Sequence, residues 1–263
     1  MGIEARYGDV AVEVRPDGVV VLEIQRPPNN FFDAALIGAL SDVYEAIDAE
    51  PSSRAVVLAA AGKHFCAGAN FSAQAAGTAP TARDTSNDLY MQAARLLEAK
   101  TPVVAAVHGA AIGGGLGLAC SADFRVGCTE TRMASNFAQL GFHHGFGLTI
   151  TLPPIVGQQK ALDMLLTGRR LDGEESYRIG LLDRLVAPEE VRAEAIRYAS
   201  EIASSAPLAV RSIRATMRGN IGERYRAATT HEGKEQAWLR GTEDFREGIR
   251  ASAERRAPNF QGR

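Results

Sequence analysis

The chain has few cysteines and no excess of charge of either sign, and both absences exclude classes of protein. Its 263 residues include only three cysteines, an odd number, widely spaced and without a C-x-x-C pair: Cys66, Cys120 and Cys128. This pattern predicts reduced thiols in a cytosolic protein rather than a disulfide framework. The formal net charge of −2 gives no bulk attraction to nucleic acid or to anionic membranes.

Signals for export and for membrane insertion are also missing. Residues 1–9 carry both charge signs and lack an apolar core, which excludes a secretory signal there. The run 101–120 contains no Asp, Glu, Lys or Arg, and its length raises the question of a membrane span. It is rich in glycine and alanine and has Pro102 near its start, which favours a buried strand followed by the start of a buried helix. We therefore expect a soluble, cytoplasmic protein.

Several motifs that announce a cofactor or a nucleophile are absent. The run 113–117 is not a G-x-G-x-x-G loop, because Leu118 holds the position of the third glycine, and there is no G-x-x-x-x-G-K-[ST] phosphate loop. No G-x-S-x-G sequence indicates a serine hydrolase. The five histidines lack H-x-x-x-H and H-E-x-x-H spacing, so we expect no metal site.

Two glycine-rich segments are the most informative feature that is present. They are F-C-A-G-A-N at 65–70 and H-G-A-A-I-G-G-G-L-G at 108–117, and each follows a strand-like apolar run, at 55–60 and at 103–107. Brought together, two such turns can direct two backbone N–H groups at one oxygen, as an oxyanion hole does. The alternative is two tight turns in which glycine only permits close packing. The residue types leave both interpretations open.

Composition and periodicity predict an α/β protein. A hydrophobic content of 46% with 23% charged residues is ordinary for a globular chain of this length. The order of elements, strands and helices first and mainly helices after residue 148, favours one β/α core with a helical C-terminal extension. Short strands are predicted at 10–14, 19–24, 55–60, 102–107 and 124–126. A helix capped by Asp33 and a loop at 77–87 are also predicted. Further helices are predicted at 88–100, 159–166, 173–179, 188–204, 207–217 and 225–240.

The two glycine segments, about forty residues apart, resemble the crotonase family, also called the enoyl-CoA hydratase/isomerase superfamily. The likeness continues with R-P-P-N-N at 26–30, which looks like the family's first CoA-contacting loop, and with T-E-D-F-R-E-G at 242–248. The resemblance implies a spiral core of ββα units with the CoA site over residues 1–200. It also implies a helical C-terminal region, 201–263, that supports a homotrimer or a dimer of trimers.

Carried over residue by residue, the resemblance assigns the oxyanion-hole N–H donors to Ala69 and Gly114. It assigns CoA contacts to Pro28, Asn29 and the main chain of Ala67. The implied partner is an acyl-CoA substrate, with no nucleic acid and no membrane. Because CoA belongs to the substrate, the resemblance implies no separate cofactor.

The sequence departs from the family where hydratases carry two glutamates as acid and base. The corresponding positions hold Gly117 and Phe137. One positioned acid or base contributes about 10²–10⁴-fold, so this chain is predicted to hydrate enoyl thioesters at close to the background rate.

Histidines in the segment 142–147 are candidates to replace the missing groups. His143 and His144 occupy a loop where other family members carry an aspartate, tyrosine or histidine, and an imidazole suits a general base. We slightly favour His144; the alternative is that one of the pair faces solvent or caps a helix. His64 and His108 are expected to bond to backbone, and Asp123 to be structural.

Three classes of function follow from these residues. The leading one is an enzyme that binds a CoA thioester and stabilises its enolate, with loop histidines for proton transfer. Its chemical rival is a hydrolase or C–C bond-cleaving enzyme that acts on a β-dicarbonyl substrate. The third is a CoA-thioester-binding protein without catalysis.

Overall fold

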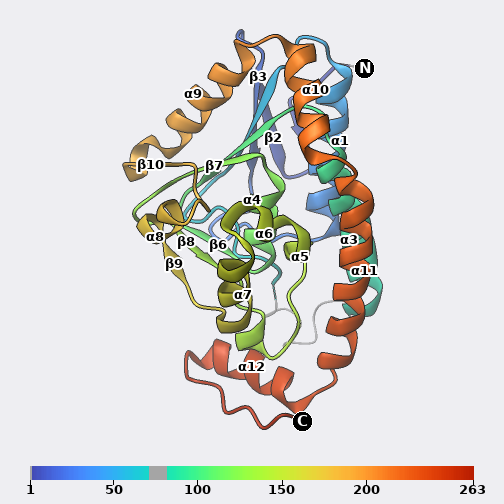
Figure 1. Cartoon of the computed structure of the whole chain (residues 1–263), viewed down its shortest axis with the longest axis vertical. Helices are drawn as coiled ribbons and strands as arrows, with labels where there is room; N and C mark the ends of the chain where they lie inside the picture. The colour runs from blue at the N-terminus through green and yellow to red at the C-terminus, as the bar shows by residue number, and fades with distance from the viewer. Residues whose placement is uncertain (1, 71–81) are drawn as a thin grey trace.

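The computed structural model of the protein describes residues 2–70 and 82–263 (Figure 1). A seven-stranded sheet forms its centre, and it is antiparallel from β1 to β3 and parallel from β3 onward. The strand order is β1 (Arg6–Tyr7), β2 (Val10–Val14), β3 (Val19–Ile24), β4 (Ala55–Ala60), β5 (Val103–Val107), β7 (Phe124–Cys128) and β10 (Arg184–Val186). A second sheet joins β6 (Ala110–Ile112), β8 (Arg132–Ala134) and β9 (Leu171–Asp172).

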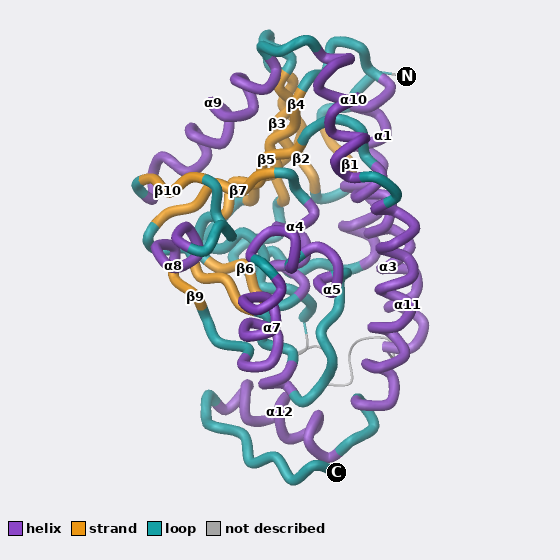
Figure 2. Tube along the Cα trace, viewed as in Figure 1, coloured by secondary structure: helices purple, strands orange, loops and turns teal. Residues whose placement is uncertain are grey.

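The central strands are covered on both faces, which explains their unbroken apolar sequences. Leu22 and Leu58 pack in the larger core, together with apolar residues of α1 (Ala34–Ala49) and α3 (Ala82–Glu98). Their neighbours Val21 and Val57 face the other way and pack against α9 (Val191–Ala203). Figure 2 shows the sheet between α9 on one side and α1 and α3 on the other.

The later helices lie around the sheet, with α10 (Pro207–Arg218) at the upper end in Figure 1 and α12 (Glu243–Glu254) at the lower end. α4 (Gly114–Ser121) starts directly after β6, and α11 (Ile221–Leu239) runs along α3 (Figure 1). α12 packs against the short 3-10 helix η1 (Ala138–Leu140). The remaining elements are α5 (Leu148–Thr151), α6 (Pro153–Val156), α7 (Gln158–Thr167), α8 (Gly173–Arg178) and η2 (Pro188–Glu190).

Most of the predicted elements are confirmed, and one is wrong in part. Asp33 caps α1 by accepting the N–H of Leu36 at 2.8 Å, as predicted. The predicted loop at 77–87 is contradicted from Ala82, where α3 begins, and 77–81 lies outside the described residues. Once later turns are packed, a helix extends at little cost into a stretch without apolar periodicity. The predicted boundary at residue 200 falls inside α9.

One partly buried carboxylate fastens the C-terminal helices to the sheet. Asp123, just before β7, accepts the N–H of Val103 and pairs with Arg214 at 2.8 Å and Arg218 at 2.9 Å, both on α10. Burial by itself would raise the pKa of this carboxyl, but the two guanidinium groups lower it below its usual value. The expected structural role of Asp123 is therefore confirmed.

The cysteines and the apolar run also match their predictions. Cys66, Cys120 and Cys128 are free thiols and are buried, and burial raises the pKa of Cys66 to about 12, which makes it an inert core residue. The run 101–120 forms β5, β6 and α4, a buried strand followed by a buried helix start. Within residues 2–70 and 82–263, no helix has both the length and the apolar character to cross a membrane.

Candidate active site

The two glycine-rich segments pair directly with each other. The N–H of Phe65 donates to the carbonyl of His108 at 2.9 Å, and the N–H of Cys66 donates to that of Ala110 at 3.0 Å. The N–H of Ile112 then donates back to Cys66 at 3.0 Å. The turns that follow β4 and β5 are thus joined by a short ladder, which fixes their separation.

Glycine is required where the backbones meet. Gly68 has φ +85°, and a Cβ there would lie 2.8 Å from the carbonyl oxygen of Ile112 and 3.5 Å from the nitrogen of Gly114. A Cβ on Gly115 would lie 2.0 Å from the carbonyl oxygen of Cys66. Close packing, the alternative interpretation of these glycines, is therefore real, and it is also what brings Gly68 beside the Gly114 nitrogen.

Two amide groups at this junction are available to a ligand. In the described part of the chain, no main-chain hydrogen bond uses the N–H of Ala69 or of Gly114, although the N–H of Gly113 donates to Ala134. Gly114 is the first residue of α4, where N–H groups have no partner within the helix and the helix dipole favours negative charge. Both residues line the same pocket.

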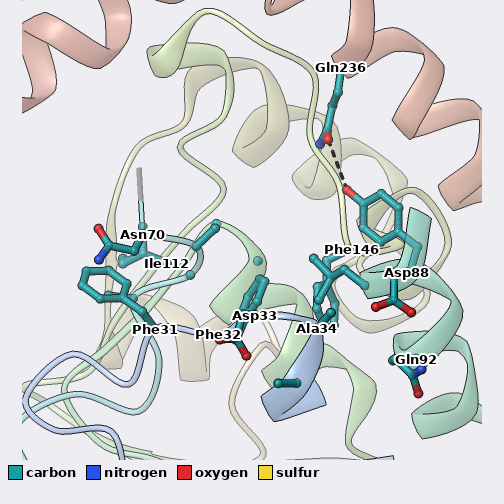
Figure 3. A pocket seen from close by; sticks show the side chains of 18 of the residues that line it. Phe31, Phe32, Asp33, Ala34, Asn70, Asp88, Gln92, Ile112, Phe146 and Gln236 are labelled. Carbon is teal, nitrogen blue, oxygen red and sulfur yellow. Dashed lines mark hydrogen bonds between the residues drawn. The ribbon is translucent and has the colours of Figure 1, made fainter. Parts of the chain in front are cut away.

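The pocket has a volume of about 1060 Å³ and mainly apolar walls (Figure 3). Several aromatic rings line it, and the rings of Phe32 and Phe146 lie 5.1 Å apart. The apolar lining residues are Phe31, Phe32, Leu89, Ile112, Phe137, Leu140, Phe142 and Phe146. Figure 3 shows Phe31 and Asn70 toward one end and Gln236, Asp88 and Gln92 toward the other.

Phenylalanine side chains occupy the region around Gly117 and Phe137, the two positions where the resemblance predicts that glutamates are replaced. A Cβ on Gly117 would lie 2.7 Å from the Cβ of Phe146, so the Phe146 side chain fills the space that a longer residue at 117 would need. Phe146 has φ +58°, a rare conformation for a bulky residue. Phe137 itself lines the pocket. Neither position supplies a polar group.

The expected CoA-contacting residues lie at or beside the pocket. Ala67 lines it, and the N–H of Ala67 donates to the carbonyl of Asn29 at 2.9 Å. Asn29 and the exposed Pro28 are next to this wall but outside the pocket lining. His64 accepts the N–H of Ala110, and His108 is hydrogen-bonded to the carbonyl of Gly62, so both bond to backbone as predicted.

The structure does not bring the loop histidines to the two amide donors. From the segment 142–147, Phe142 and Phe146 line the pocket, whereas His143 and His144 do not. Their stacked rings, with centroids 4.1 Å apart, lie beside α11, and the ring of His231 is 6.1 Å from that of His143.

Hydrogen bonds to α11 hold this loop in place. Buried Glu232 accepts the N–H of Gly147 at 2.9 Å, and Thr149 gives its single hydroxyl proton to Glu232 at 2.5 Å. His144 Nε2 lies 2.8 Å from the same hydroxyl oxygen and must be the donor there, because a threonine has only one O–H. Burial, followed by the charges of His143 and His231, lowers the pKa of His144 to about 4. The His144 ring is therefore neutral at physiological pH.

A polar cluster that the sequence did not reveal closes the α3–α11 side of the pocket. It consists of Tyr90 on α3 with Gln236 and Arg240 at the end of α11. Arg240 lines the pocket, and its guanidinium lies above the ring of Phe142. Nothing in the sequence links Tyr90 with residues some 150 positions away.

Comparison with known proteins agrees with this geometry. The chain matches the enoyl-CoA hydratase/isomerase family over residues 14–263. It is 35% identical to a carnitinyl-CoA dehydratase of Proteus mirabilis over 250 residues, which cover 92% of this chain and 95% of the relative. It is 34% identical to an enoyl-CoA isomerase/hydratase of Zymoseptoria tritici, over 93% of this chain and 84% of the relative.

Solved structures give the same result. The crystal structure of an enoyl-CoA hydratase/isomerase from Pseudoalteromonas atlantica superposes with a TM-score of 0.84 at 30% identity, covering 96% of this chain and all of the other. An enoyl-CoA hydratase from Bacillus anthracis gives a TM-score of 0.76 at 28% identity, covering 97% of this chain and all of the other. The predicted crotonase-like α/β fold is therefore confirmed, and the chain belongs to the enoyl-CoA hydratase/isomerase family of enzymes.

Proposed function

We propose that this enzyme binds an acyl-CoA thioester and stabilises the thioester enolate with the N–H groups of Ala69 and Gly114. The observation that supports this is the pair of amides, bonded to no other main chain in the described residues, at the junction of two interlocked turns. Donors fixed in place before the reaction stabilise a developing oxyanion without the cost of reorganisation. CoA enters as part of the substrate, and no separate cofactor is proposed.

The rival functions use the same two amides and differ in what they need around them. A hydrolase or C–C bond-cleaving enzyme for a β-dicarbonyl substrate needs no CoA contact, whereas a silent binding protein needs no proton transfer. Ala67 and Asn29 beside the pocket support the CoA thioester over the first rival. Turnover separates the proposed enzyme from the second.

We first expect binding that depends on the thioester carbonyl. Calorimetry should detect butyryl-CoA at up to millimolar ligand. The matched thioether S-butyl-CoA, which lacks only the carbonyl oxygen, should bind about tenfold more weakly, since two hydrogen bonds of roughly 0.5–1.5 kcal/mol each are lost. Equal affinities would show that the two amides do not hold the carbonyl. No heat with any acyl-CoA would remove the proposed function.

Hydration of crotonyl-CoA should be very slow, because Gly117 and Phe137 stand where the resemblance puts two carboxylates. Each missing acid or base removes about 10²–10⁴-fold. A Gly117→Glu variant should not restore hydration, since the side chain at 117 would collide with Phe146. The control is the double variant Gly117→Glu/Phe146→Gly, in which the loss of the phenylalanine side chain makes room for the glutamate. Hydration by the unmodified protein at a rate typical of efficient enzymes would show that the acid and base lie elsewhere.

We propose that His143 or His144 transfers the proton. Because neither side chain lines the pocket, this requires their loop to move toward it. If a substrate is found, His144→Ala or His143→Ala should lower turnover at least about 10²-fold with little change in binding. If His144 is the base, turnover should fall as pH drops through the pKa of its ring, because a protonated imidazole cannot accept a proton. Full turnover in both variants would assign the histidines to the scaffold that orients Phe142 and Phe146.

We also propose a homotrimer or a dimer of trimers. Large apolar side chains on α10 and α11 are exposed in the single chain, with Leu208 at 81%, Met217 at 82% and Trp238 at 60%, and exposed apolar patches mark contact surfaces. Light scattering at micromolar concentration should give three or six times the mass of the chain. A stable monomer under these conditions would contradict this assembly.

A further inference from the structure

Two polar side chains of the pocket lining, Asn136 and Asp88, make no hydrogen bond or ion pair with any residue that the structure describes. Others, such as Asp33 and Arg95, are held by ion pairs within the wall. Asp88 is exposed on α3, where water satisfies its carboxylate. Asn136 is half-buried and lies beside the turn that carries the amide of Gly114. The amide donors and the expected CoA contacts leave this carboxamide unexplained.

The second sheet fixes where Asn136 lies. β8 pairs in parallel with β6, with Ala134 opposite Ile112, and the N–H of Gly113 donates to the carbonyl of Ala134 at 2.8 Å. Asn136 follows two residues after Ala134. Its α-carbon packs so closely on Gly168 that a Cβ on that glycine would lie 3.2 Å from it. The backbone of Asn136 is therefore held on two sides, and its side chain starts from a fixed point.

The carboxamide of Asn136 rests on Gly113, the residue before the Gly114 amide. A Cβ on Gly113 would lie 3.2 Å from Oδ1 of Asn136 and 3.7 Å from the ring of Phe137. Because Oδ1 is the atom of this side chain nearest to that point, the N–H₂ group lies farther from Gly113. Consecutive α-carbons are about 3.8 Å apart, so the carboxamide and the Gly114 amide are neighbours on one turn.

The neighbours of this carboxamide in the turn are apolar. The ring of Phe32 lies over Gly114, where a Cβ would overlap it, and the ring of Phe137 lies over Gly113. Neither ring can accept a conventional hydrogen bond from an amide. In apolar surroundings a hydrogen bond is strengthened and an unpaired amide is costly. A ligand oxygen that reaches the N–H₂ group of Asn136 is therefore favoured.

We infer that Asn136 is a specificity-determining residue that donates a hydrogen bond to a carbonyl oxygen on C3 of the acyl chain, so that the substrate is a 3-oxoacyl-CoA thioester. This rests on the proposed function, in which the oxygen on C1 binds the N–H groups of Ala69 and Gly114. Three carbon atoms separate the two oxygens of such a thioester. The donors that hold them lie on, or against, consecutive residues of one turn. A carboxamide supplies its N–H without adding charge.

A carbonyl on C3 also agrees with the absence of polar groups at Gly117 and Phe137. When the enolate forms, the C2–H bond breaks, its proton passes to a base, and its electron pair moves onto carbonyl oxygen. With a carbonyl on each side of C2, both oxygens share that pair, so the proton is more acidic and a weaker base removes it. The Asn136 N–H then stabilises the second oxygen as the two amides stabilise the first.

The test compares three CoA thioesters with four-carbon acyl groups by calorimetry. Acetoacetyl-CoA has a carbonyl on C3, 3-hydroxybutyryl-CoA has a hydroxyl there, and butyryl-CoA has neither. Acetoacetyl-CoA should bind about three- to tenfold more tightly than butyryl-CoA, the effect of one added hydrogen bond. It should also bind more tightly than the hydroxy thioester, which forms no shared enolate. Equal affinities for acetoacetyl-CoA and either other thioester, or a reversed order, would overturn the inference.

Variants at position 136 identify the group responsible. Asn136→Leu has a similar volume but no N–H, so it should abolish the preference for acetoacetyl-CoA and leave the affinity for butyryl-CoA unchanged. Asn136→Asp keeps the shape but sets a carboxylate against the C3 oxygen, so it should bind acetoacetyl-CoA more weakly than butyryl-CoA. Thermal unfolding checks that each variant folds, and the isosteric Asp variant decides the matter if the Leu variant does not.

The matched control is Gln139→Leu, which removes a second carboxamide three residues away. Gln139 is exposed, donates to the carbonyl of Thr167 at 2.8 Å and is not among the pocket-lining residues. This variant should keep the preference for acetoacetyl-CoA. A preference that survives Asn136→Leu would overturn the inference. So would an equal loss of acetoacetyl-CoA and butyryl-CoA in the folded Asn136 variants, because it would assign Asn136 to the support of the turn.

The enolate itself gives a readout that a supporting role would not change. Enolate formation by acetoacetyl-CoA changes its ultraviolet absorbance, so a pH titration of the bound thioester gives the pKa of its C2 proton. This pKa should be lower in the unmodified protein than in Asn136→Leu, because the donated N–H stabilises the charged form. Equal values would overturn the inference. Binding of butyryl-CoA without a preference for acetoacetyl-CoA removes only the inference, whereas no binding of any acyl-CoA removes the proposed function with it.

Discussion

The arrangement of this site depends on one close contact, between the α-carbon of Gly115 and the carbonyl of Cys66. Any side chain at 115 would meet that carbonyl at 2.0 Å, so only glycine lets α4 begin where it does. The contact continues the parallel pairing of β4 with β5 into the turns through Cys66 and Ile112. Because the two amides belong to the main chain, their positions follow from the register of the sheet and need no particular side chain.

The side chains of the pocket, in contrast, are set by the C-terminal helices. Glu232 and Gln236, four residues apart on α11, bond the loop at Gly147 and at His143. These hydrogen bonds hold the loop so that Phe142 and Phe146 line the pocket and the two histidines lie beside α11. α11 itself lies on α3 and follows α10, whose arginines are tied to Asp123, just before β7. One part of the chain thus fixes the amides, and another, more than a hundred residues later, shapes the wall that faces them.

The difference between local signals and long-range packing explains which parts of the structure could be predicted from the sequence. Local signals were sufficient for the strands at 19–24 and 55–60 and for the Asp33 cap, because alternation, apolar runs and caps act over a few residues. The two glycine turns could be identified, and their likeness to a known family is the basis for assigning the oxyanion-hole donors to Ala69 and Gly114. Strands of two or three residues, such as β6 and β9, are too short to show a pattern. The orientation of His144 and the meeting of Tyr90 with Arg240 depend on how α11 packs, which no local pattern records.

The glycine turns that hold the two amides and the helices that form the pocket wall are separate parts of the chain. In the proposed function the backbone amides contact only the carbonyl oxygen, which all thioesters share, so they carry no information about the acyl chain. In that proposal selectivity comes from side chains along the pocket, whose wall includes residues of α3 and of the end of α11. A change at position 236 or 240 leaves the pairing of the two turns intact, because no hydrogen bond within the described residues links either side chain to the glycine segments. The wall of the pocket at the end of α11 can therefore change without disturbing the contact on which the two amides depend.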